Sequence, residues 1–527
     1  MFRRTFLQNG AAIATTLWPG VRTVAGNTSA LKRRGSAQPF SYPMLKDAAR
    51  TLASAPYQAQ PDQLPPSLAT LTWDQWEAIR FRDEDALWAG ESLRFQVKFL
   101  HLGLDVKTPV RVFTIDAGLA QEIAYGPALF DFSKSGIDSA KLPATLGFAG
   151  FRLCFYPDWI RDVAVFQNHS YFRAVDGDKQ YGLSHRGLAV DCGMPTPEEF
   201  PYFIAYYLQR PQKDSSRLDV YGLLDSPSVT GAYHFAIDAA DTLTMDIEAA
   251  LYPRKQIERL GVAPGTSMFL CGSNDRRVGA DLRPQIHDSD GLQLNTGANE
   301  RIWRPLVNPG VARVNTFNDE NPRGFGLMQR DHNFDHYQDD GAFYDKRPSA
   351  WVEPRGKWGK GAVVLVELPA AAESVDNIVA FWTPAVKPQR GQELLYSYRL
   401  YWCRENPFPS PLATVQATRT GVGGLVAQPH TYFSWRFEVD FQGRELASLK
   451  YGVPLTPVIS ASRGAIELAS ARPLASINGW RALFDLKLTD DSVEPINLRL
   501  VLASAGRPVT ETWLYQYTPP PPDRRRI

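Results

Sequence analysis

Apolar and polar residues alternate along much of this chain, and no other feature constrains its fold as strongly. In residues 92–100 every second residue from Leu93 to Phe99 is apolar, and residues 392–403 (QELLYSYRLYWC) also alternate. A period of two places successive side chains on opposite faces of a β-strand. Residues 228–252 contain two such runs joined by a DAAD turn, which predicts a hairpin. The alternation therefore predicts an all-β protein.

Helical spacing is confined to short stretches. Residues 43–57 carry apolar side chains at helical spacing, and residues 73–82 and 254–260 predict two shorter helices. Further strands are predicted at residues 110–115, 361–367, 378–382, 432–441, 480–488, 496–502 and 512–517.

A proline-rich break divides the chain into two β-rich parts. We predict a large domain over residues 38–405, a linker over 406–411 within the string RENPFPSPL, and a second domain over 412–518. About a hundred residues of short strands in the second part predict an immunoglobulin-like sandwich. Residues 519–527 contain a proline run, which predicts a flexible, extended tail.

Residues 1–30 have the features of an export signal. Arg3 and Arg4 precede Thr-Phe-Leu, a modestly apolar run and a region of small residues, in the order of a twin-arginine signal. The alternative is a basic, disordered N-terminus. No stretch elsewhere reaches the roughly 18 apolar residues of a membrane-spanning helix. The sequence therefore predicts a periplasmic protein without stable membrane insertion.

The balance of charges excludes some partner classes. Lys plus Arg number 57 and Asp plus Glu number 56, so nothing in the charge favours a nucleic acid or an anionic membrane. The four cysteines are far apart and form no zinc or redox motif, which leaves disulfides and buried free thiols both open. No Walker, Rossmann or HExxH motif is present, and we expect no cofactor.

Residues 284–384 hold the densest mixture of acids, aromatics and arginines. Glycoside hydrolysis needs one carboxyl group that donates a proton and a second that activates water or attacks directly. Asp376 fits the acid, because it precedes the apolar strand at 378–382, and apolar surroundings raise the pKa of a carboxyl group. Asp288 fits the partner in a polar loop, His287 to Asp290, where hydrogen bonds would keep it ionised.

Both segments have a purely structural alternative. Asp376 and Asn377 are also common turn residues at the start of a strand, and His-Asp-Ser-Asp also forms capped loops. Spacing alone favours that alternative.

Aromatic and arginine residues follow in the same stretch. Tyr344, Trp351 and Trp358 lie near Arg347 and Arg355 in sequence. Rings that stack on pyranose faces and guanidinium groups that hold hydroxyls would wall a glucan groove. The alternative is that the rings are core residues and the arginines lie on the surface.

An acidic and histidine-rich segment nearby raises the question of a metal. His332 and His336 are four residues apart, which on a helix would share a face, but the segment matches no ligand motif. A solvated loop, a sugar-contacting loop and a metal site are ranked in that order, and we expect no metal. The segment's acids and histidines are Asp331, His332, Asp335, His336, Asp339 and Asp340.

Several long strings resemble one family of proteins. They are LGFAGFR, SYFRAVDGDKQYGLSHRGLAVD, TSMFLCGSNDRR, PQIHDSD, NPRGFGLMQRDHNFDHYQD, YDKRPSAWVEPRGKWGKG and ETWLYQY. Together they resemble the periplasmic glucan biosynthesis proteins of the OpgD/OpgG (MdoD/MdoG) type, and the twin-arginine signal is similar to the D-type branch. The resemblance covers nearly the whole chain beyond the signal.

This resemblance implies a fold and a substrate. It implies a large sandwich of the sugar-enzyme (mutarotase-like) kind joined to an immunoglobulin-like domain, acting on the β-1,2-linked backbone of osmoregulated periplasmic glucans. The family is similar to anomer-inverting β-1,2-glucanases, and some relatives cyclise the glucan instead. A non-catalytic glucan-binding scaffold, partners among other glucan-biosynthesis proteins and a homodimer stay open.

The resemblance also implies site residues. Asp376, in the string ESVDN, corresponds to the general acid, and Asp288 to the end of the path that activates water. Glu373 and Tyr344 correspond to positions that support this site. The string departs from the family pattern at its second and third residues, which leaves the carboxylates intact. The expected substrate-binding residues are His287, Arg347, Trp351, Arg355 and Trp358.

Overall fold

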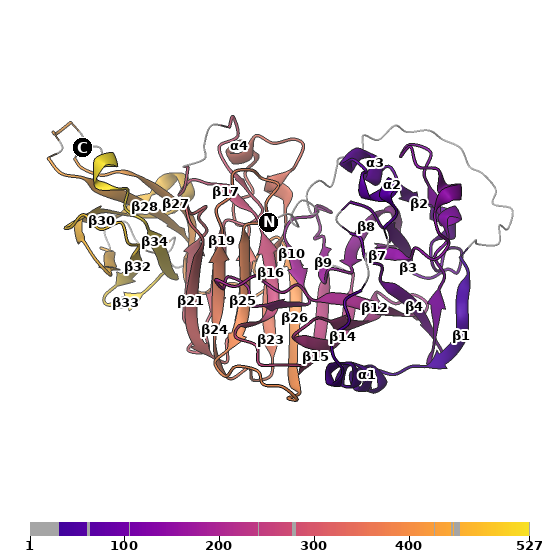
Figure 1. Cartoon of the computed structure of the whole chain (residues 1–527). Coiled ribbons are helices and arrows are strands. Elements are labelled where there is room, and N and C mark those ends of the chain that lie inside the picture. Colours follow the sequence, from indigo (N-terminus) through magenta and orange to yellow (C-terminus); the bar gives the residue numbers. More distant parts are fainter. Residues whose placement is uncertain are drawn as a thin grey trace.

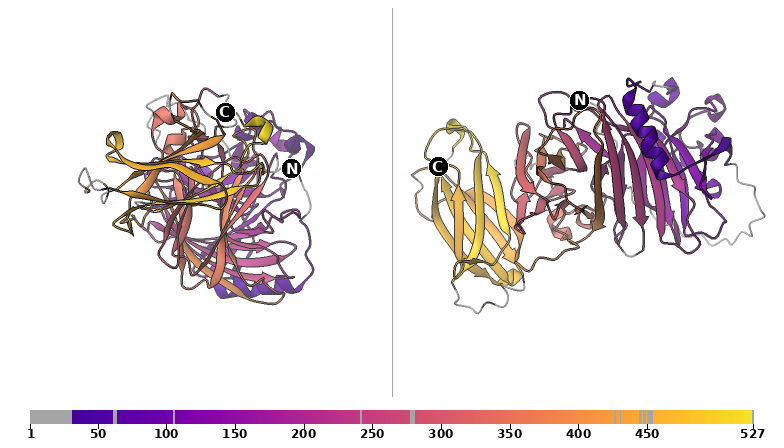
Figure 2. Two further views of the ribbon diagram at one scale, coloured as in Figure 1. Left: turned by 90° about the vertical axis from the view of Figure 1, so that its left-hand side faces the viewer. Right: turned by 90° about the horizontal axis from the view of Figure 1, so that it is seen from below.

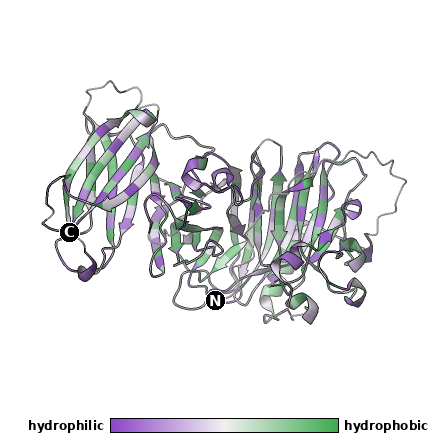
Figure 3. Ribbon diagram, turned by 90° about the horizontal axis from the view of Figure 1, so that it is seen from above, coloured by the Kyte–Doolittle hydropathy of each residue, from purple (hydrophilic) through white to green (hydrophobic). Residues whose placement is uncertain are grey.

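The computed structural model describes residues 31–525, except 61–63, 105, 241, 277–280, 426, 430, 444–445, 447–448 and 450–453. The predicted export signal lies outside the described residues. Strands dominate, so the all-β prediction is confirmed (Figure 1). Figure 3 shows apolar and polar residues alternating along these strands, which is the pattern that predicted them.

A 16-stranded sheet runs through the whole molecule. Its order is β1 (Arg33–Pro39), β5 (Leu119–Ile123), β4 (Arg111–Asp116), β12 (Tyr202–Gln209), β13 (Arg217–Asp225), β14 (Val229–Asp238), β15 (Thr244–Pro253), β26 (Leu394–Cys403), β23 (Ser349–Arg355), β22 (Gly324–Met328), β19 (Gly291–Asn295), β20 (Arg301–Pro305), β34 (Thr512–Tyr517), β32 (Ile496–Ser504) and β29 (Thr456–Ala461), with β33 (Arg507–Pro508) paired to β32.

A 10-stranded sheet packs against the first one. Its order is β21 (Arg313–Glu320), β24 (Lys360–Glu367), β25 (Ile378–Pro384), β16 (Leu260–Ser267), β10 (Ser184–Arg186), β9 (Tyr171–Ala174), β8 (Asp158–Gln167), β7 (Phe148–Phe155) and β3 (Phe95–His101), with β11 (Leu188–Val190) paired to β16. The rings of Phe151 and Tyr206, one from each sheet, meet at 5.1 Å between centroids. The main hydrophobic core therefore lies between the two sheets.

The C-terminal part forms a second, smaller sandwich. A four-stranded sheet of β27 (Thr414–Val422), β28 (Ser434–Gln442), β31 (Gly479–Lys487) and β30 (Ala465–Leu474) faces the strands β34, β32 and β29. Phe437, Phe484 and Trp513 pack in its core. Figure 2 shows this sandwich at one end of the molecule.

The two sandwiches share backbone hydrogen bonding, which the sequence did not predict. Strand β20 pairs in parallel with β34, so that Ile302 lies opposite Thr512. Trp303 and Trp351 also join the core of the smaller sandwich. The proline-rich segment thus connects two parts that a continuous sheet and a common core already join.

Most predicted elements are present with shifted ends. The helix at 43–57 is α1 (Tyr42–Ser54), whose first turn is capped by the Ser41 side chain accepting from the Met44 amide. The helix at 73–82 is shortened to α3 (Trp73–Glu77). In the described part of the chain, α2 (Pro66–Ala69) and α4 (Phe334–Tyr337) are further short α-helices, and β2 (Arg80–Phe81) pairs with β6 (Phe130–Asp131) as β17 (Phe269–Cys271) does with β18 (Ile286–His287).

The helix predicted at 254–260 is wrong. Arg254 instead fixes an irregular segment, because its guanidinium donates to the Asp225 carboxylate and to the carbonyls of Leu52 and Ala55. At Leu260 the chain already enters β16, which pairs with strands on both sides. Tertiary contacts therefore override the local helical spacing here.

The C-terminal tail, which the sequence predicts to be flexible and extended, makes contacts at its described end. The Arg525 guanidinium donates to the carbonyls of Asp490 and Ser492, which tie the described end of the tail to the smaller sandwich. All four cysteines are buried free thiols, so the disulfide alternative is wrong. In the described part of the chain, no helix is long and apolar enough to cross a membrane.

Candidate active site

Two segments that are distant in sequence meet at the strand β17. Asp288 follows β18, and its amide donates to the carbonyl of Met268 at 2.9 Å. Asn377, just before β25, accepts from the Phe269 amide at 2.8 Å and donates to the Phe269 carbonyl at 3.0 Å. These bonds place the segments of Asp288 and Asp376 side by side. In Figure 1, β17 and α4 lie above the central strands.

Asp288 is buried and ion-paired. Only 4% of the residue is exposed, and its carboxylate pairs with the Arg347 guanidinium. Burial raises the pKa of Asp288, and the charge of Arg347 opposes that shift. The polar loop that was predicted to keep Asp288 ionised through hydrogen bonds is buried, and the Arg347 guanidinium stabilises the carboxylate.

Arg347 is itself fixed by its surroundings. Its Nε and Nη2 both donate to the Ala342 carbonyl at 3.1 Å, and its guanidinium lies 4.3 Å from the centre of the Tyr344 ring. These contacts fix the guanidinium so that Nη1 donates to the Asp288 carboxylate.

Arg173, which the sequence analysis did not include in the site, interacts electrostatically with both aspartates. The charges of Asp376 and Asp288 both interact with its guanidinium. Burial lowers the pKa of Arg173, while Tyr181, Asp162 and Asp376 raise it. The guanidinium stacks at 4.4 Å on the Tyr181 ring, whose hydroxyl donates to Asp162 at 2.6 Å. Arg173 lies within the string SYFRAVDGDKQYG, one of the strings that resemble the family.

Glu373 and Tyr344 form the outer part of the site. The Tyr344 hydroxyl donates to Glu373 Oε2 at 2.9 Å, and Arg283 Nη1 lies 2.8 Å from the same oxygen. Tyr344 is 1% exposed, whereas the Glu373 side chain is 37% exposed. Burial raises the pKa of Tyr344, so its hydroxyl keeps its proton. Arg283, the second residue that was missed, also pairs with Asp339 at 2.7 Å.

His287 lies beneath the site and not on its surface. The ring is fully buried, and its Nδ1 and Nε2 contact Gln329 Oε1 at 2.9 Å and Gln285 Oε1 at 3.0 Å. The ring stacks on Phe269, and burial lowers the pKa of His287 to about 4. Both ring nitrogens contact protein side chains, and the ring has no exposed surface. This corrects the prediction that His287 contacts the substrate directly.

The predicted aromatic wall is also corrected. Trp351 is 1% exposed on β23, and Trp358 is buried, with its Nε1 donating to the Ser397 carbonyl at 3.2 Å. Arg355 is exposed and pairs with Glu353 at 3.2 Å, away from the aspartates. Trp351 is a core residue because β23 is an interior strand of the large sheet, and Trp358 is one because its ring packs against Trp382 and Tyr398. Of the proposed wall, Arg347 pairs with Asp288, and Tyr344 packs against Arg347.

The acidic and histidine-rich segment has internal partners. His336 Nδ1 contacts Asp331 Oδ2 at 2.6 Å, and His332 Nδ1 contacts the Asp345 carbonyl at 2.7 Å. Among the described residues, no group of three or more His, Cys, Asp or Glu side chains is arranged to hold a metal ion.

Asp290 has an unusual environment two residues beyond Asp288. Its Oδ2 accepts from the amides of Arg330 and Asp331 at 3.1 Å, while its Oδ1 is buried without a hydrogen-bond partner among the described groups. Burial raises the pKa of Asp290 to about 7. Arg330 in turn pairs with the fully buried Glu511 of the smaller sandwich at 2.6 Å. The loop of Asp288 is therefore connected, through Asp290 and Arg330, to Glu511 of the smaller sandwich.

This pKa predicts a pH-dependent stability. In the unfolded chain Asp290 ionises near pH 4, whereas the folded protein keeps the proton until about pH 7. The folded state binds more protons in this window, so its stability falls as the pH rises from about 4 to 7. We expect Asp290→Asn to lack this fall. Urea unfolding of the parent and the variant at several pH values measures this change in stability. A difference between the two proteins that is constant with pH would contradict the prediction. Asp335→Asn, at an exposed carboxylate, is the control.

Comparison with known proteins places the chain in a family. The family model described as "Periplasmic glucan biosynthesis protein, MdoG" matches residues 40–517. The chain is 57% identical over 525 residues to "Glucans biosynthesis protein D" of Stenotrophomonas maltophilia (strain K279a), covering 99% of this chain and 98% of the relative. It is 56% identical over 534 residues to the protein of the same name from Xanthomonas axonopodis pv. citri (strain 306), with both chains fully covered. The chain therefore belongs to the family of periplasmic glucan biosynthesis proteins.

Proposed function

We propose that this protein is an anomer-inverting endo-β-1,2-glucanase that trims the backbone of periplasmic glucans. The observation that carries this proposal is the meeting of the Asp288 and Asp376 segments at β17, with Arg173 in electrostatic reach of both carboxyl groups. Two carboxyl groups that flank one site are the requirement of glycoside hydrolysis. The family's printed description supports a glucan as the substrate.

Each carboxyl group has a distinct task in this proposal. Asp376 gives its proton to the glycosidic oxygen as the bond from that oxygen to the anomeric carbon breaks. A water molecule attacks the anomeric carbon from the opposite face, and its proton passes toward Asp288. Arg347 keeps Asp288 able to accept that proton, because the guanidinium charge stabilises the carboxylate.

The outer pair orients the sugar next to this chemistry. Glu373 is the partly exposed member, and Tyr344 and Arg283 hold its Oε2 from behind. A carboxylate fixed in this way can accept hydrogen bonds from glucosyl hydroxyls without losing its orientation. Export by the twin-arginine route, directed by residues 1–30, would bring the folded protein to the periplasm.

The stereochemistry of the first product tests the proposal. Purified protein is incubated with linear β-1,2-glucan and followed by NMR and mass spectrometry. Inversion of a β-linkage predicts that the α-anomer appears first and that chains shorten from internal sites. A β-anomer would contradict inversion, ring products without a reducing end would indicate transglycosylation, and unchanged chains would overturn the enzymatic assignment.

A further inference from the structure

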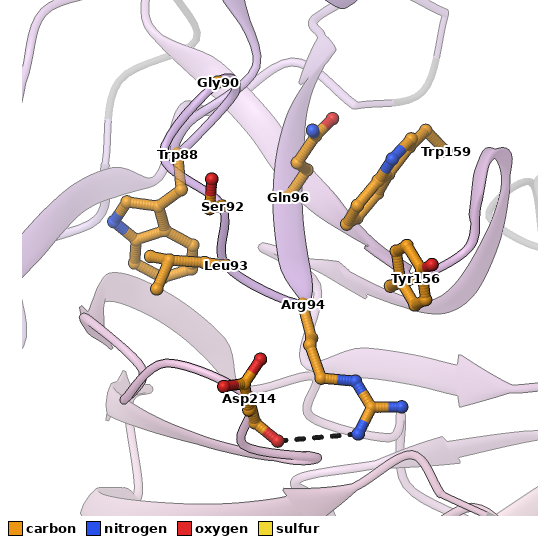
Figure 4. Close-up of a pocket in the computed structure, with 9 residues that line it drawn as sticks. All are labelled: Trp88, Gly90, Ser92, Leu93, Arg94, Gln96, Tyr156, Trp159 and Asp214. Atoms are coloured by element: carbon orange, nitrogen blue, oxygen red, sulfur yellow. Dashed lines mark hydrogen bonds between the residues drawn. The ribbon is translucent and has the colours of Figure 1, made fainter.

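A cavity of about 660 Å³ lies outside the candidate active site, beside the turn between β7 and β8. Figure 4 shows Tyr156 of this turn and Trp159 of β8 on one side, Trp88 on the other, and Gln96 and Ser92 between them. We call this cavity the hairpin pocket. Its volume falls within the range of about 300–1,000 Å³ typical of small-molecule sites.

The lining of the hairpin pocket suits a neutral sugar. Tyr156 is 55% exposed, and its ring lies 6.1 Å from that of Trp159. Aromatic faces bind the apolar faces of pyranose rings, and the Gln96 amide and Ser92 hydroxyl offer both donors and acceptors to sugar hydroxyls. Arg94 is held at the base, where Nη1 donates to the Asp214 carbonyl at 3.5 Å.

The backbone around the hairpin pocket adds an independent observation. Trp88, Ser92 and Asp214 have φ values of 68°, 54° and 62°, and Gly90 has 75°. The left-handed region is uncommon for non-glycine residues because their Cβ atom crowds the backbone there. Residues with positive φ also occur in other turns of the chain, and these three lie on the rim of one cavity.

The hairpin pocket faces the same side of the 10-stranded sheet as the active site. On β3, Phe95 and Val97 point into the core, so Gln96 and Lys98 point outward. Directly paired residues share a face, and the pairs run from Lys98 to Arg152, then Val165, then Arg173. Lys98 and Arg173 are therefore three strand spacings of about 4.8 Å apart, which is ~14 Å in total.

We propose that the hairpin pocket is a remote sugar-binding subsite, which holds glucosyl units of the same chain that passes Asp376. This proposal rests on the proposed function for the identity of the sugar. A polymer that spans both places is bound more tightly than a short oligosaccharide that fills only one, because the second contact is intramolecular.

Binding without turnover tests the subsite. Calorimetric titration of the Asp376→Asn protein with long linear β-1,2-glucan and with short β-1,2-gluco-oligosaccharides gives the two reference affinities. Adding Trp159→Ala and Tyr156→Ala should weaken long-chain binding by about tenfold or more and leave short-chain binding unchanged. Tyr156→Ala alone, which removes a largely exposed ring, should give part of the loss without affecting folding.

Matched controls separate the possible outcomes. Tyr432→Ala removes a 43% exposed aromatic ring on the C-terminal sandwich and should leave both affinities unchanged. Equal long-chain affinity in parent and pocket variants would overturn the subsite. If the parent does not bind β-1,2-glucan, the titration is repeated with β-1,3- and β-1,4-linked glucans. Pocket-dependent binding of either would support the subsite while overturning the proposed substrate, and its absence would overturn the subsite.

Discussion

Asp376→Asn is expected to reduce turnover of linear β-1,2-glucan by about 10²- to 10⁴-fold, the range that a positioned general acid supplies. The amide has nearly the same shape as the carboxyl group but no acidic proton to give to the leaving oxygen. Asp376 is 8% exposed, so bulk water cannot easily take its place as the acid. The Kd for glucan should change much less than kcat, because the variant keeps the surrounding residues. Single-turnover kinetics with separate binding titrations measure the two effects.

A matched variant keeps this test specific. Asp340→Asn makes the same change at an exposed carboxylate of the neighbouring segment and should leave kcat unchanged. The pH profile gives a second readout, since loss of the acid should remove the alkaline fall in kcat while the acidic limb persists. Full turnover by a folded Asp376→Asn protein would contradict the assignment of Asp376 as the general acid and of Asp288 as its partner.

The fold was largely predictable because its signals are local. Alternation within one strand identified β3 and β26, and the spacing of apolar residues identified α1. The join between β20 and β34 was not predictable in this way, since it depends on residues near 302 and 512 that share no local pattern. The same reason explains the failed helix at 254–260, where partners from other strands decide the backbone.

Some residues of the candidate site could be predicted from the sequence, and others depend on contacts between distant segments. Asp288, Glu373 and Tyr344 lie in strings that resemble the family, and the structure brings all three to Arg347 or Arg283. Burial could not be predicted from the residue types. The polar residues around Asp288 predicted hydrogen bonds, and the aromatic-rich stretch predicted a wall facing the substrate, but neither pattern tells which segments of the fold cover these residues. Arg173 could not be assigned to the site in this way either, because Asp288 and Asp376 lie more than a hundred residues further along the chain.

Arg347→Met is expected to lower the free energy of unfolding by about 3–5 kcal/mol near pH 8, the usual cost of leaving a buried charge without its partner. Methionine is unbranched like the arginine stem and carries no charge, so the Asp288 carboxylate remains buried without its ion pair. Arg173 offsets part of this cost, because its charge still interacts with Asp288. Urea unfolding of the full-length protein measures the change.

The pH dependence of this loss distinguishes a charge effect from a packing effect. Burial already raises the pKa of Asp288, and removal of Arg347 raises it further, so the folded variant takes up a proton as the pH falls. The folded state then binds more protons than the unfolded state, and the deficit in stability shrinks toward acidic pH. Asp288→Asn in the Arg347→Met protein should recover much of the stability at pH 8, because it removes the unpaired charge. Additive losses in the double variant, or a deficit that does not change with pH, would mean that Arg347 acts through its packing on Tyr344 and not through its charge.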